Sequence, residues 1–555
     1  MSSARLTPAP DVHPDPPPAT ATAQVSVVLI AYDDVRNVRR AVASALHQGP
    51  AVAEVVAVDD ASRDGTGAVL DALARTEPRL RVLHRTVNSG GCGTPRNEGL
   101  RAATGRYVMF LDSDDVLPPG AVDTLLTAAL RAGAPVAAGA CVRRELPSLR
   151  EVRWQPELYT RRRTLRSPEA RPRLVRDTLC VNKLYDRRFL TGHDVRFPEG
   201  RYVYEDFVFT ARVLAAAPRI ALVPETVYVW QVRRDAARPS LSLDRDAVTN
   251  WQARLRAHRA CVDILREAGR TRLAHAARTK FLDHDLRMYA VELPARDERH
   301  RREWWRLTRA HLAGFEAAEL AAARAPARWV ARVVLACDTP VDLERLAELA
   351  ARPARLLPPY AQAAGRAVWS AELPGVELDG ILTKPVTRLP VTVEAEPVLG
   401  RRAELRLHVH DLYGRLAGAG PVGVDLALRR QSAHRSGPVH TAALSPAPGG
   451  GWSARVRLDL AALAATAPRG RPQSWALAAT VRCADGSRVR VALRPAGPGL
   501  RRTLVVTRRG LLLCRPYRTT GGALSLRVAR GATGAAGIAV RRARRAVSGA
   551  LARRR

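Results

Sequence analysis

Carboxylates gather at the end of one short apolar run. Residues 106–115 read Arg-Tyr-Val-Met-Phe-Leu-Asp-Ser-Asp-Asp, so five apolar residues are followed by Asp112, Asp114 and Asp115. An Asp-x-Asp pair can hold a divalent cation through its oxygen atoms, and that cation can bridge a diphosphate. The alternative is a solvated turn, because Asp is common after strands.

A second acidic pair lies about ninety residues downstream. Glu205 and Asp206 are followed by Phe207-Val208-Phe209 and a helical pattern, which predicts a carboxylate at the start of a helix. Such a carboxylate can act as a general base that takes a proton from an attacking hydroxyl group. The alternative is a helix N-cap.

Several buried strands must position these groups. Apolar runs at 24–31, 54–58, 80–83 and 107–111 alternate with amphipathic stretches, which predicts a parallel, nucleotide-binding α/β layer. The carboxyl ends of parallel strands share one edge of a sheet. We therefore expect Tyr32, the pair Asp59-Asp60 and the pair Asp112/Asp114 to converge in one crevice.

Four segments carry a family resemblance. Residues 25–32 (Val-Ser-Val-Val-Leu-Ile-Ala-Tyr), 58–62 (Val-Asp-Asp-Ala-Ser), 95–99 (Pro-Arg-Asn-Glu-Gly) and 110–115 (Phe-Leu-Asp-Ser-Asp-Asp) resemble the family 2 glycosyltransferases of the GT-A fold, a Rossmann-like α/β fold. The resemblance covers about residues 25–242. It implies an inverting enzyme that uses a nucleotide-diphosphate sugar, with UDP-sugars expected, and Mn²⁺ or Mg²⁺.

The resemblance also implies roles for individual residues. Asp206 is the implied catalytic base with Glu205 as its neighbour, and the implied metal ligands are Asp114 and Asp112. The implied donor-binding residues are Ala31, Tyr32, Asp60, Asn88, Arg96, Asp112, Ser113, Arg233 and Ser240. Ala31 stands where the family often has Pro. Arg96 has independent physical sense, because a guanidinium fork matches diphosphate or base acceptors, although it can equally be a helix-surface residue.

The rest of the chain divides by its periodicity. Residues 1–23 are rich in Pro and Ala and predict disorder, and the α/β domain is expected at 24–242. Apolar residues at helical spacing predict a helical linker at 243–365. Alternating strands predict an immunoglobulin-like β-sandwich at 366–520. The Arg-rich tail at 521–555 predicts either a basic amphipathic helix on anionic lipid or a disordered tail.

The composition indicates which classes of partner and which cellular compartment to expect. The chain has 89 Lys and Arg residues against 53 Asp and Glu residues, a formal net charge of +36, which favours polyanions. Part of this charge can reflect coding bias. The seven cysteines show no Cys-x-x-Cys pair, and the chain has neither a long apolar span nor an apolar leader. We expect a cytoplasmic protein with reduced cysteines, able to lie on the inner face of the cell membrane.

This layout resembles that of wall teichoic acid poly(ribitol-phosphate) glycosyltransferases. The resemblance implies transfer of a sugar to an anionic cell-envelope polymer, and a homo-oligomer formed through the β-sandwich. One rival hypothesis is a polyanion- or nucleic-acid-binding protein with a transferase-like scaffold. Against specific nucleic-acid binding, aromatic residues make up only 5% of the chain and do not interleave with a basic motif. A third hypothesis is a glycosyltransferase with a lipid or protein acceptor.

Overall fold

A computed structural model describes the fold over most of the chain. The described residues are 24–146, 149–233, 245–400, 402–430, 436–465, 472–497, 500–501, 503–507, 510–519 and 521–530. The expected disordered N-terminus, Ser240 and residues 531–555 of the basic tail lie outside these ranges, whereas residues 524–530 of that tail form a strand instead of the helix or disorder expected there. The chain forms two compact units, and the first comprises the described residues of 1–145, 151–232 and 264–273.

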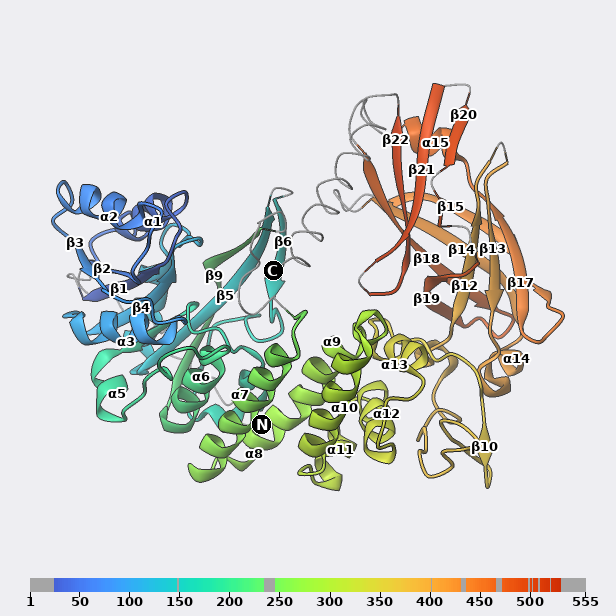
Figure 1. Cartoon of the computed structure of the whole chain (residues 1–555), viewed down its shortest axis with the longest axis horizontal. Coiled ribbons are helices and arrows are strands. Elements are labelled where there is room, and N and C mark those ends of the chain that lie inside the picture. Colours follow the sequence, from blue (N-terminus) through green and yellow to red (C-terminus); the bar gives the residue numbers. More distant parts are fainter. Residues whose placement is uncertain are drawn as a thin grey trace, which may run out of the picture. The chain divides into compact units, whose positions relative to one another are not determined.

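The first unit is built on a twisted sheet (Figure 1). Its elements in chain order are β1 Val25–Ala31, α1 Val38–Leu46, β2 Val52–Asp59, α2 Thr66–Ala74, β3 Leu80–His84, α3 Gly93–Ala102, β4 Tyr107–Asp112, α4 Ala121–Ala132, β5 Val136–Leu146, β6 Arg150–Trp154, β7 Arg163–Leu165, β8 Lys183–Asp186, α5 Arg187–Gly192, α6 Glu205–Ala216 and β9 Ile220–Arg233. The strand order is β3-β2-β1-β4-β8-β5-β9-β7, and β6 pairs with β5.

The first strands match the expected parallel layer. Strands β3, β2, β1 and β4 pair in parallel, and every residue of β1 is buried, as are all but the last of β4. Helices α1 and α3 cover opposite faces of these strands (Figure 1). Helix α3 packs closely because Gly99 has no side chain: an added Cβ would lie 2.3 Å from Val28. These four strands therefore have the parallel direction that the sequence predicts.

Beyond β4 the sheet is mixed, in a part of the chain for which the sequence predicted no strand direction. Strand β8 is inserted between β4 and β5 and is antiparallel to both. Strand β7 is antiparallel to β9 at the other edge. The physical reason is the long connection between β5 and β8. It allows β8 to enter the sheet in the opposite direction, whereas a parallel strand would need a crossover connection.

The second unit contains the expected helical region and a β-rich region. Its helices are α7 Val248–Glu267, α8 Thr271–Lys280, α9 Arg287–Ala290, α10 Glu298–Leu312, α11 Ala317–Ala322, α12 Ala325–Ala336 and α13 Leu343–Ala350, and residues 264–273 of α7 and α8 group with the first unit. One hydrophobic core extends from Trp251 through Trp329 and Trp369 to Val528, so the helices pack with the strands that follow.

The β-rich region fits a sandwich. Its elements are the short pair β10 Gln362–Ala363 and β11 Arg366–Ala367, then β12 Val393–Val398, β13 Glu404–Val409, α14 Arg415–Ala419, β14 Pro421–Arg430, β15 Ser436–Ala443, β16 Ser445–Pro446, β17 Trp452–Arg457, α15 Leu460–Ala465, β18 Gln473–Cys483, β19 Arg488–Pro495, β20 Thr503–Thr507, β21 Gly510–Arg518 and β22 Leu524–Arg530. Strand β18 alternates strictly between buried and half-buried residues, as a strand with one face on a core does. Within the described residues, no helix is both long and apolar enough to cross a bilayer.

Candidate active site

Arg96 joins carboxylates from two distant elements. Its side chain lies in α3 and the residue is only 2% exposed. Its Nη2 donates to Asp112 Oδ1 at 2.7 Å, at the end of β4. Its Nη1 donates to Glu205 Oε1 and to Asp206 Oδ1, both at 2.8 Å, at the start of α6. Arg96 is therefore a buried cation that holds both acidic pairs together, not a helix-surface residue.

Burial controls the protonation of this cluster. It raises the pKa of Glu205 to about 7, and the adjacent Asp206 adds to the effect. Burial also raises the pKa of Asp206, and Arg96 opposes that shift. Although burial disfavours the charge on Arg96, the Asp112 carboxylate and its neighbours raise the pKa of Arg96 well above its ordinary value. The cluster thus contains a permanent cation beside carboxyl groups that exchange protons nearer neutrality than free Asp or Glu do.

Cys180 orients the Asp206 carboxylate. Both its backbone N–H and its thiol donate hydrogen bonds to Asp206, and both interactions lower the pKa of that carboxyl group. The thiol is fully buried, and burial raises its pKa well above the ordinary value, so it stays protonated as a donor. The Phe197 ring packs on the other side of the cluster, with its centroid 5.3 Å from the Arg96 guanidinium carbon. The Asp206 carboxylate is therefore contacted both by Arg96 and by Cys180.

The acidic turn after β4 has one carboxylate that is buried and two that are accessible to solvent. Asp115 is buried, accepting from Tyr228 Oη and from the Gln231 backbone N–H, both at 2.7 Å. Burial raises the pKa of Asp115 well above its ordinary value. Gln231 Nε2 donates to the Asp114 carbonyl oxygen at 2.8 Å, while Asp114 itself is exposed and Asp112 is half-buried. Asp115 therefore fixes the turn, and Asp112 and Asp114 are accessible.

The predicted metal ligands fit a cation that is shared with a substrate. Asp112 and Asp114 offer oxygen atoms of the kind that Mg²⁺ and Mn²⁺ prefer. Arg96 occupies one oxygen of Asp112. Among the described residues, no group of three or more His, Cys, Asp or Glu side chains could hold a metal alone. The remaining ligands would have to be water or phosphate oxygens, which is the usual arrangement for Mg²⁺ in phosphate-transfer sites.

A second polar group lies at the end of β2. Asp60 is buried and accepts hydrogen bonds from Asn88 Nδ2 at 2.9 Å and from the Ser89 backbone N–H and hydroxyl. Its Oδ1 also pairs with Arg85 Nε at 2.8 Å. These donors fill the acceptor sites of one carboxylate, so the predicted contact of Asp60 with a base edge requires a donor to leave. Asp60 and Asn88 are nevertheless adjacent in the structure.

Part of the chain is similar to a known family. Residues 26–191 match the sequence profile of Glycosyl transferase family 2. The succinoglycan biosynthesis protein ExoO of Rhizobium meliloti is 31% identical over 231 residues, which is 40% of this chain and 64% of that protein. Residues 26–191 therefore resemble a glycosyl transferase family 2 domain.

Two further relatives act on poly(ribitol phosphate). The poly(ribitol-phosphate) β-glucosyltransferase of Bacillus spizizenii is 24% identical over 46% of this chain and 39% of its own length. The poly(ribitol-phosphate) β-N-acetylglucosaminyltransferase TarS of Staphylococcus aureus is 30% identical over 33% of this chain and 30% of its own length. The chain thus spans less than two thirds of the length of each of these relatives.

A solved structure supports the fold beyond the family 2 domain. The crystal structure of S. aureus TarS superposes with a TM-score of 0.52 at 18% identity and covers 92% of this chain and 85% of that chain. This agreement supports the predicted GT-A-like α/β domain and the C-terminal β-rich region. The profile match ends at residue 191, so helix α6 with Glu205 and Asp206 lies after it.

The structure places the other predicted donor residues of the family 2 domain at the same sheet edge. Ala31 ends β1 and is buried, whereas Tyr32 is 47% exposed. The Ser113 hydroxyl donates to Asp34 Oδ2 at 2.9 Å, which joins the turns after β1 and β4. Arg233 is the last residue of β9, and its side chain, like Ser240, lies outside the described residues.

Glycines allow the loop before α3 to lie against the loop before α6. An added Cβ at Gly93 would lie 2.1 Å from the Pro198 carbonyl oxygen, and one at Gly91 would lie 2.8 Å from the Gly200 carbonyl oxygen. Asn97 reinforces this contact, because its side chain donates to the Phe197 carbonyl oxygen and accepts from the Phe197 N–H, both at 2.9 Å. This packing brings the start of α6 to Arg96.

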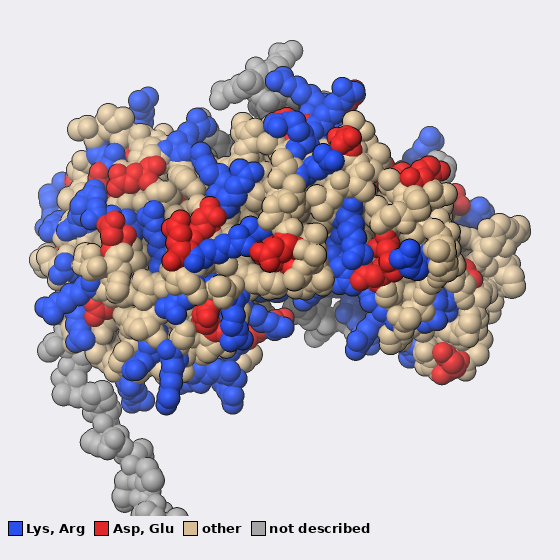
Figure 2. All heavy atoms as spheres, turned by 90° about the horizontal axis from the view of Figure 1, so that it is seen from below, with Lys and Arg blue, Asp and Glu red and all other residues tan. Residues whose placement is uncertain are grey.

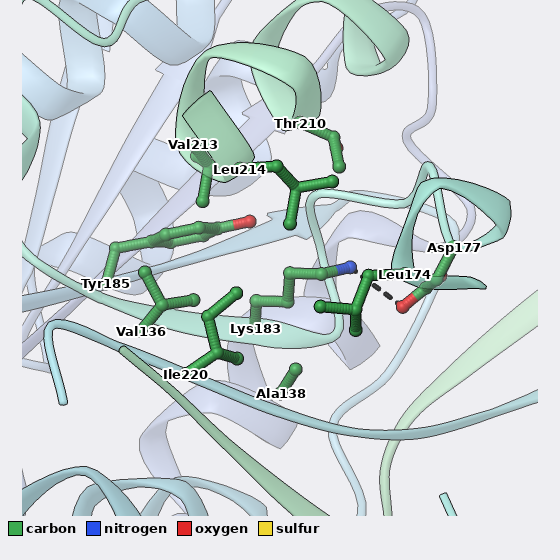
Figure 3. A pocket seen from close by; sticks show the side chains of 10 residues that line it. All are labelled: Val136, Ala138, Leu174, Asp177, Lys183, Tyr185, Thr210, Val213, Leu214 and Ile220. Carbon is green, nitrogen blue, oxygen red and sulfur yellow. Dashed lines mark hydrogen bonds and ion pairs between the residues drawn. The ribbon is translucent and has the colours of Figure 1, made fainter. Parts of the chain in front are cut away.

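Sequence reasoning did not identify the supporting residues Cys180 and Phe197, and it gave Tyr228 and Gln231 no individual role. No local signal identifies them, since each lies in an ordinary apolar or mixed segment. Lys183, the first residue of β8, is not one of the predicted catalytic residues. It is buried, and its Nζ donates to Asp177 Oδ2 at 2.8 Å beside a cavity of 10 Å³ (Figure 3). That volume holds at most one water molecule. Lys183 therefore stabilises the segment that carries Cys180.

Proposed function

We propose that this protein is an inverting glycosyltransferase that moves a sugar from a UDP-sugar to a hydroxyl group of an anionic cell-envelope polymer such as a polyol phosphate. The observation that carries the proposal is the shared cation. Asp112, at the carboxyl end of a buried strand, and Asp206, at the start of a helix, bond to the same buried Arg96. A donor-side carboxylate and a candidate base therefore open on one site.

Asp206 is proposed to act as the general base. An inverting transfer needs one group that takes the proton of the acceptor hydroxyl as its oxygen attacks the anomeric carbon. Burial raises the pKa of Asp206, which makes it a better proton acceptor than a free Asp, while Arg96 and Cys180 interact with the carboxyl group and oppose that shift. Glu205, with a pKa of about 7, is proposed to position the acceptor or its loop.

The donor side is proposed to use the turn after β4. Asp112 and Asp114 would hold Mn²⁺ or Mg²⁺, which would supply positive charge to the departing diphosphate. Tyr32 offers an exposed ring for the base, and Asn88 and Asp60 form the polar wall beside it. Ala31, Ser113, Arg233 and Ser240 remain predicted donor-binding residues from the sequence.

The names of the relatives support the acceptor class. Two of them act on poly(ribitol phosphate), and one of these transfers glucose and the other N-acetylglucosamine. A polyphosphate acceptor also agrees with the net charge of +36. Such an acceptor places the proposed reaction at the cytoplasmic face of the membrane, with oligomerisation through the β-sandwich as a further proposal. ExoO favours a growing polysaccharide as the second candidate acceptor.

The test replaces the proposed base. Asp206→Asn should reduce transfer by about a hundred- to ten-thousandfold and leave UDP-sugar binding within a few fold, because the amide cannot accept the proton. Asp194→Asn changes the same charge at a side chain that is 78% exposed and serves as the control. Near-normal turnover of Asp206→Asn in an assay with donor and acceptor would show that the base assignment is wrong.

A titration separates the enzyme from the scaffold hypothesis. Wild-type protein is titrated with UDP-sugars plus Mn²⁺, and in parallel with DNA at physiological salt. Saturable, metal-dependent binding of the UDP-sugar supports the enzyme. Salt-sensitive DNA binding without UDP-sugar binding supports the polyanion-binding protein.

A further inference from the structure

One segment of the first unit is rich in positive charge. Residues 151–176, which connect β6 to the segment before β8, contain eight arginines and three glutamates. Figure 2 shows that Lys and Arg side chains spread widely over the face it draws. We define the arginine cluster as the six arginines of residues 161–173: Arg161, Arg162, Arg163, Arg166, Arg171 and Arg173.

The cluster is held together rather than dispersed. The pKa of Arg171 is below its ordinary value, first because of partial burial and then because of the guanidinium groups of Arg163, Arg173 and Arg161. The contacts agree, because Arg171 Nη2 donates to the Glu157 carbonyl oxygen and Arg173 Nη1 pairs with Glu157 Oε2 at 3.0 Å, so these cationic groups lie close together. Repulsion between them costs free energy in the free protein, and it is relieved when an anion binds between the groups.

Several members of the cluster are available to a ligand. Arg161, Arg163 and Arg166 are exposed, and none of the three has a carboxylate partner among the described residues. Arg162 pairs with Glu225 at 2.5 Å and Arg173 pairs with Glu157 at 3.0 Å. Both of these pairs are exposed, and exposed pairs are worth about 1 kcal/mol or less. An incoming phosphate group can displace them at small cost.

Strand β9 links the cluster to the candidate active site. Arg163 of β7 is opposite Leu222 of β9, and Val229 of the same strand is bridged to Val116 in the turn that follows Asp115. Seven residues separate Leu222 from Val229, which is about 23 Å along a strand. The cluster thus lies within reach of a chain-like acceptor but too far away to contact the reacting hydroxyl group.

We propose that the arginine cluster 161–173 is the docking surface for phosphate groups of the acceptor polymer, remote from the hydroxyl that is glycosylated. This inference rests on the function proposed above. Arginine suits the role because its planar fork binds phosphate oxygens in pairs. A polymer with a phosphate in every repeat engages several weak contacts at once, so their effects multiply.

The same surface is less suited to nucleic acid. Single-strand binders stack bases on exposed aromatic rings. Among residues 151–176, Tyr159 is buried and Trp154 is half-buried with its Nε1 bonded to Asp177 at 3.0 Å. The exposed part of the cluster therefore offers charge without a stacking surface, which matches a polyol phosphate.

The experiment compares two triple variants of the full chain. The cluster variant carries Arg161→Gln, Arg163→Gln and Arg166→Gln. The control variant carries three substitutions at exposed arginines of α4 and α5 and the end of α2, and it removes the same charge: Arg75→Gln, Arg131→Gln and Arg188→Gln. The probes are poly(ribitol phosphate) of defined length, a short ribitol phosphate oligomer, and DNA.

The expected result is specific to the long polymer. The cluster variant should raise the KM for long poly(ribitol phosphate) at least fivefold, flatten its dependence on salt, and leave kcat, donor hydrolysis and the KM for the short oligomer unchanged. The control variant should keep the wild-type KM. Equal changes in both variants, or no change in either, would overturn the docking surface while transfer by the wild type still supports the proposed function.

Direct binding distinguishes a failure of the function from a failure of the surface. If wild-type protein transfers no sugar to any polymer, the proposed function fails. Equilibrium binding of the same polymer then still tests the surface, because loss of binding in the cluster variant alone supports it. Stronger, cluster-dependent binding of DNA than of polymer at physiological salt would overturn the assignment to a polyol phosphate.

Discussion

Removal of the buried cation at Arg96 should destabilise the first unit strongly. Arg96→Gln deletes three charge-assisted hydrogen bonds of 2.7–2.8 Å and leaves Asp112, Glu205 and Asp206 without their shared partner. Breaking a buried ion pair from one side costs about 3–5 kcal/mol. For a unit of this size, about 2–4 °C of melting temperature corresponds to each kcal/mol, so the first unit should melt about 6–20 °C lower.

The assay is differential scanning calorimetry of the full chain at pH 8, with amide exchange in β1 and β4 identifying the transition of the first unit. Arg101→Gln in the same helix is the matched control. Arg101 is 53% exposed and lies 3.6 Å from Glu199, a surface pair worth at most about 1 kcal/mol. The control should therefore shift the transition by less than about 4 °C.

Measuring the loss of stability of Arg96→Gln at two pH values separates the electrostatic contribution of Arg96 from its packing contribution. The pKa of Glu205 is raised in the folded protein to about 7, so this carboxyl group is ionised at pH 8 and largely protonated at pH 5. In the folded protein Glu205 is therefore mostly neutral below pH 7. At that pH Arg96 has one ionised partner fewer than at pH 8. The penalty for Arg96→Gln should be smaller at pH 5 than at pH 8. An equal penalty at both values, or a shift no larger than that of the control, would refute the argument.

Three further predictions concern the surroundings of the cluster. Cys180→Ala should raise the pKa of the proposed base, because a donor to its carboxylate is lost, and should move the acid limb of the kcat/KM profile to higher pH; an unmoved limb contradicts this. Asp114→Asn should raise the Mn²⁺ concentration for half-maximal transfer about tenfold or more, whereas Asp123→Asn, exposed on α4, should not. Gly93→Ala places a Cβ 2.1 Å from a carbonyl oxygen and should cost about 1–3 kcal/mol in thermal unfolding, while Gly192→Ala, with open space around it, should cost less.

The part of the site that depends on strand ends could be predicted from the sequence. Apolar runs at 25–31 and 107–112 are long enough to be strands and are buried throughout or nearly so, so the polar residues that follow them must reach one sheet edge. The Glu205-Asp206 pair stands at the start of α6 for a similarly local reason, because the apolar helical pattern begins immediately after it.

The contacts that complete the site depend on long-range packing. Arg96 and Asp206 are 110 residues apart, and nothing in the sequence near Arg96 distinguishes a buried hub from an exposed helical arginine. The sequence also does not predict that β8 pairs antiparallel to β4, since the four residues of β8 carry no pattern that indicates strand direction. Both features depend on tertiary packing between segments that are distant in the sequence, which hydrophobic periodicity and composition do not encode.

Asp115 has a consequence for how much chain is needed to complete the acidic turn. Its carboxylate is held by Tyr228 and by the Gln231 N–H, more than 110 residues downstream. During synthesis the turn therefore cannot reach its final form until β9 has left the ribosome. A fragment that stops where the profile match stops, at residue 191, would keep every acidic side chain of the turn and lose the strand that fixes them.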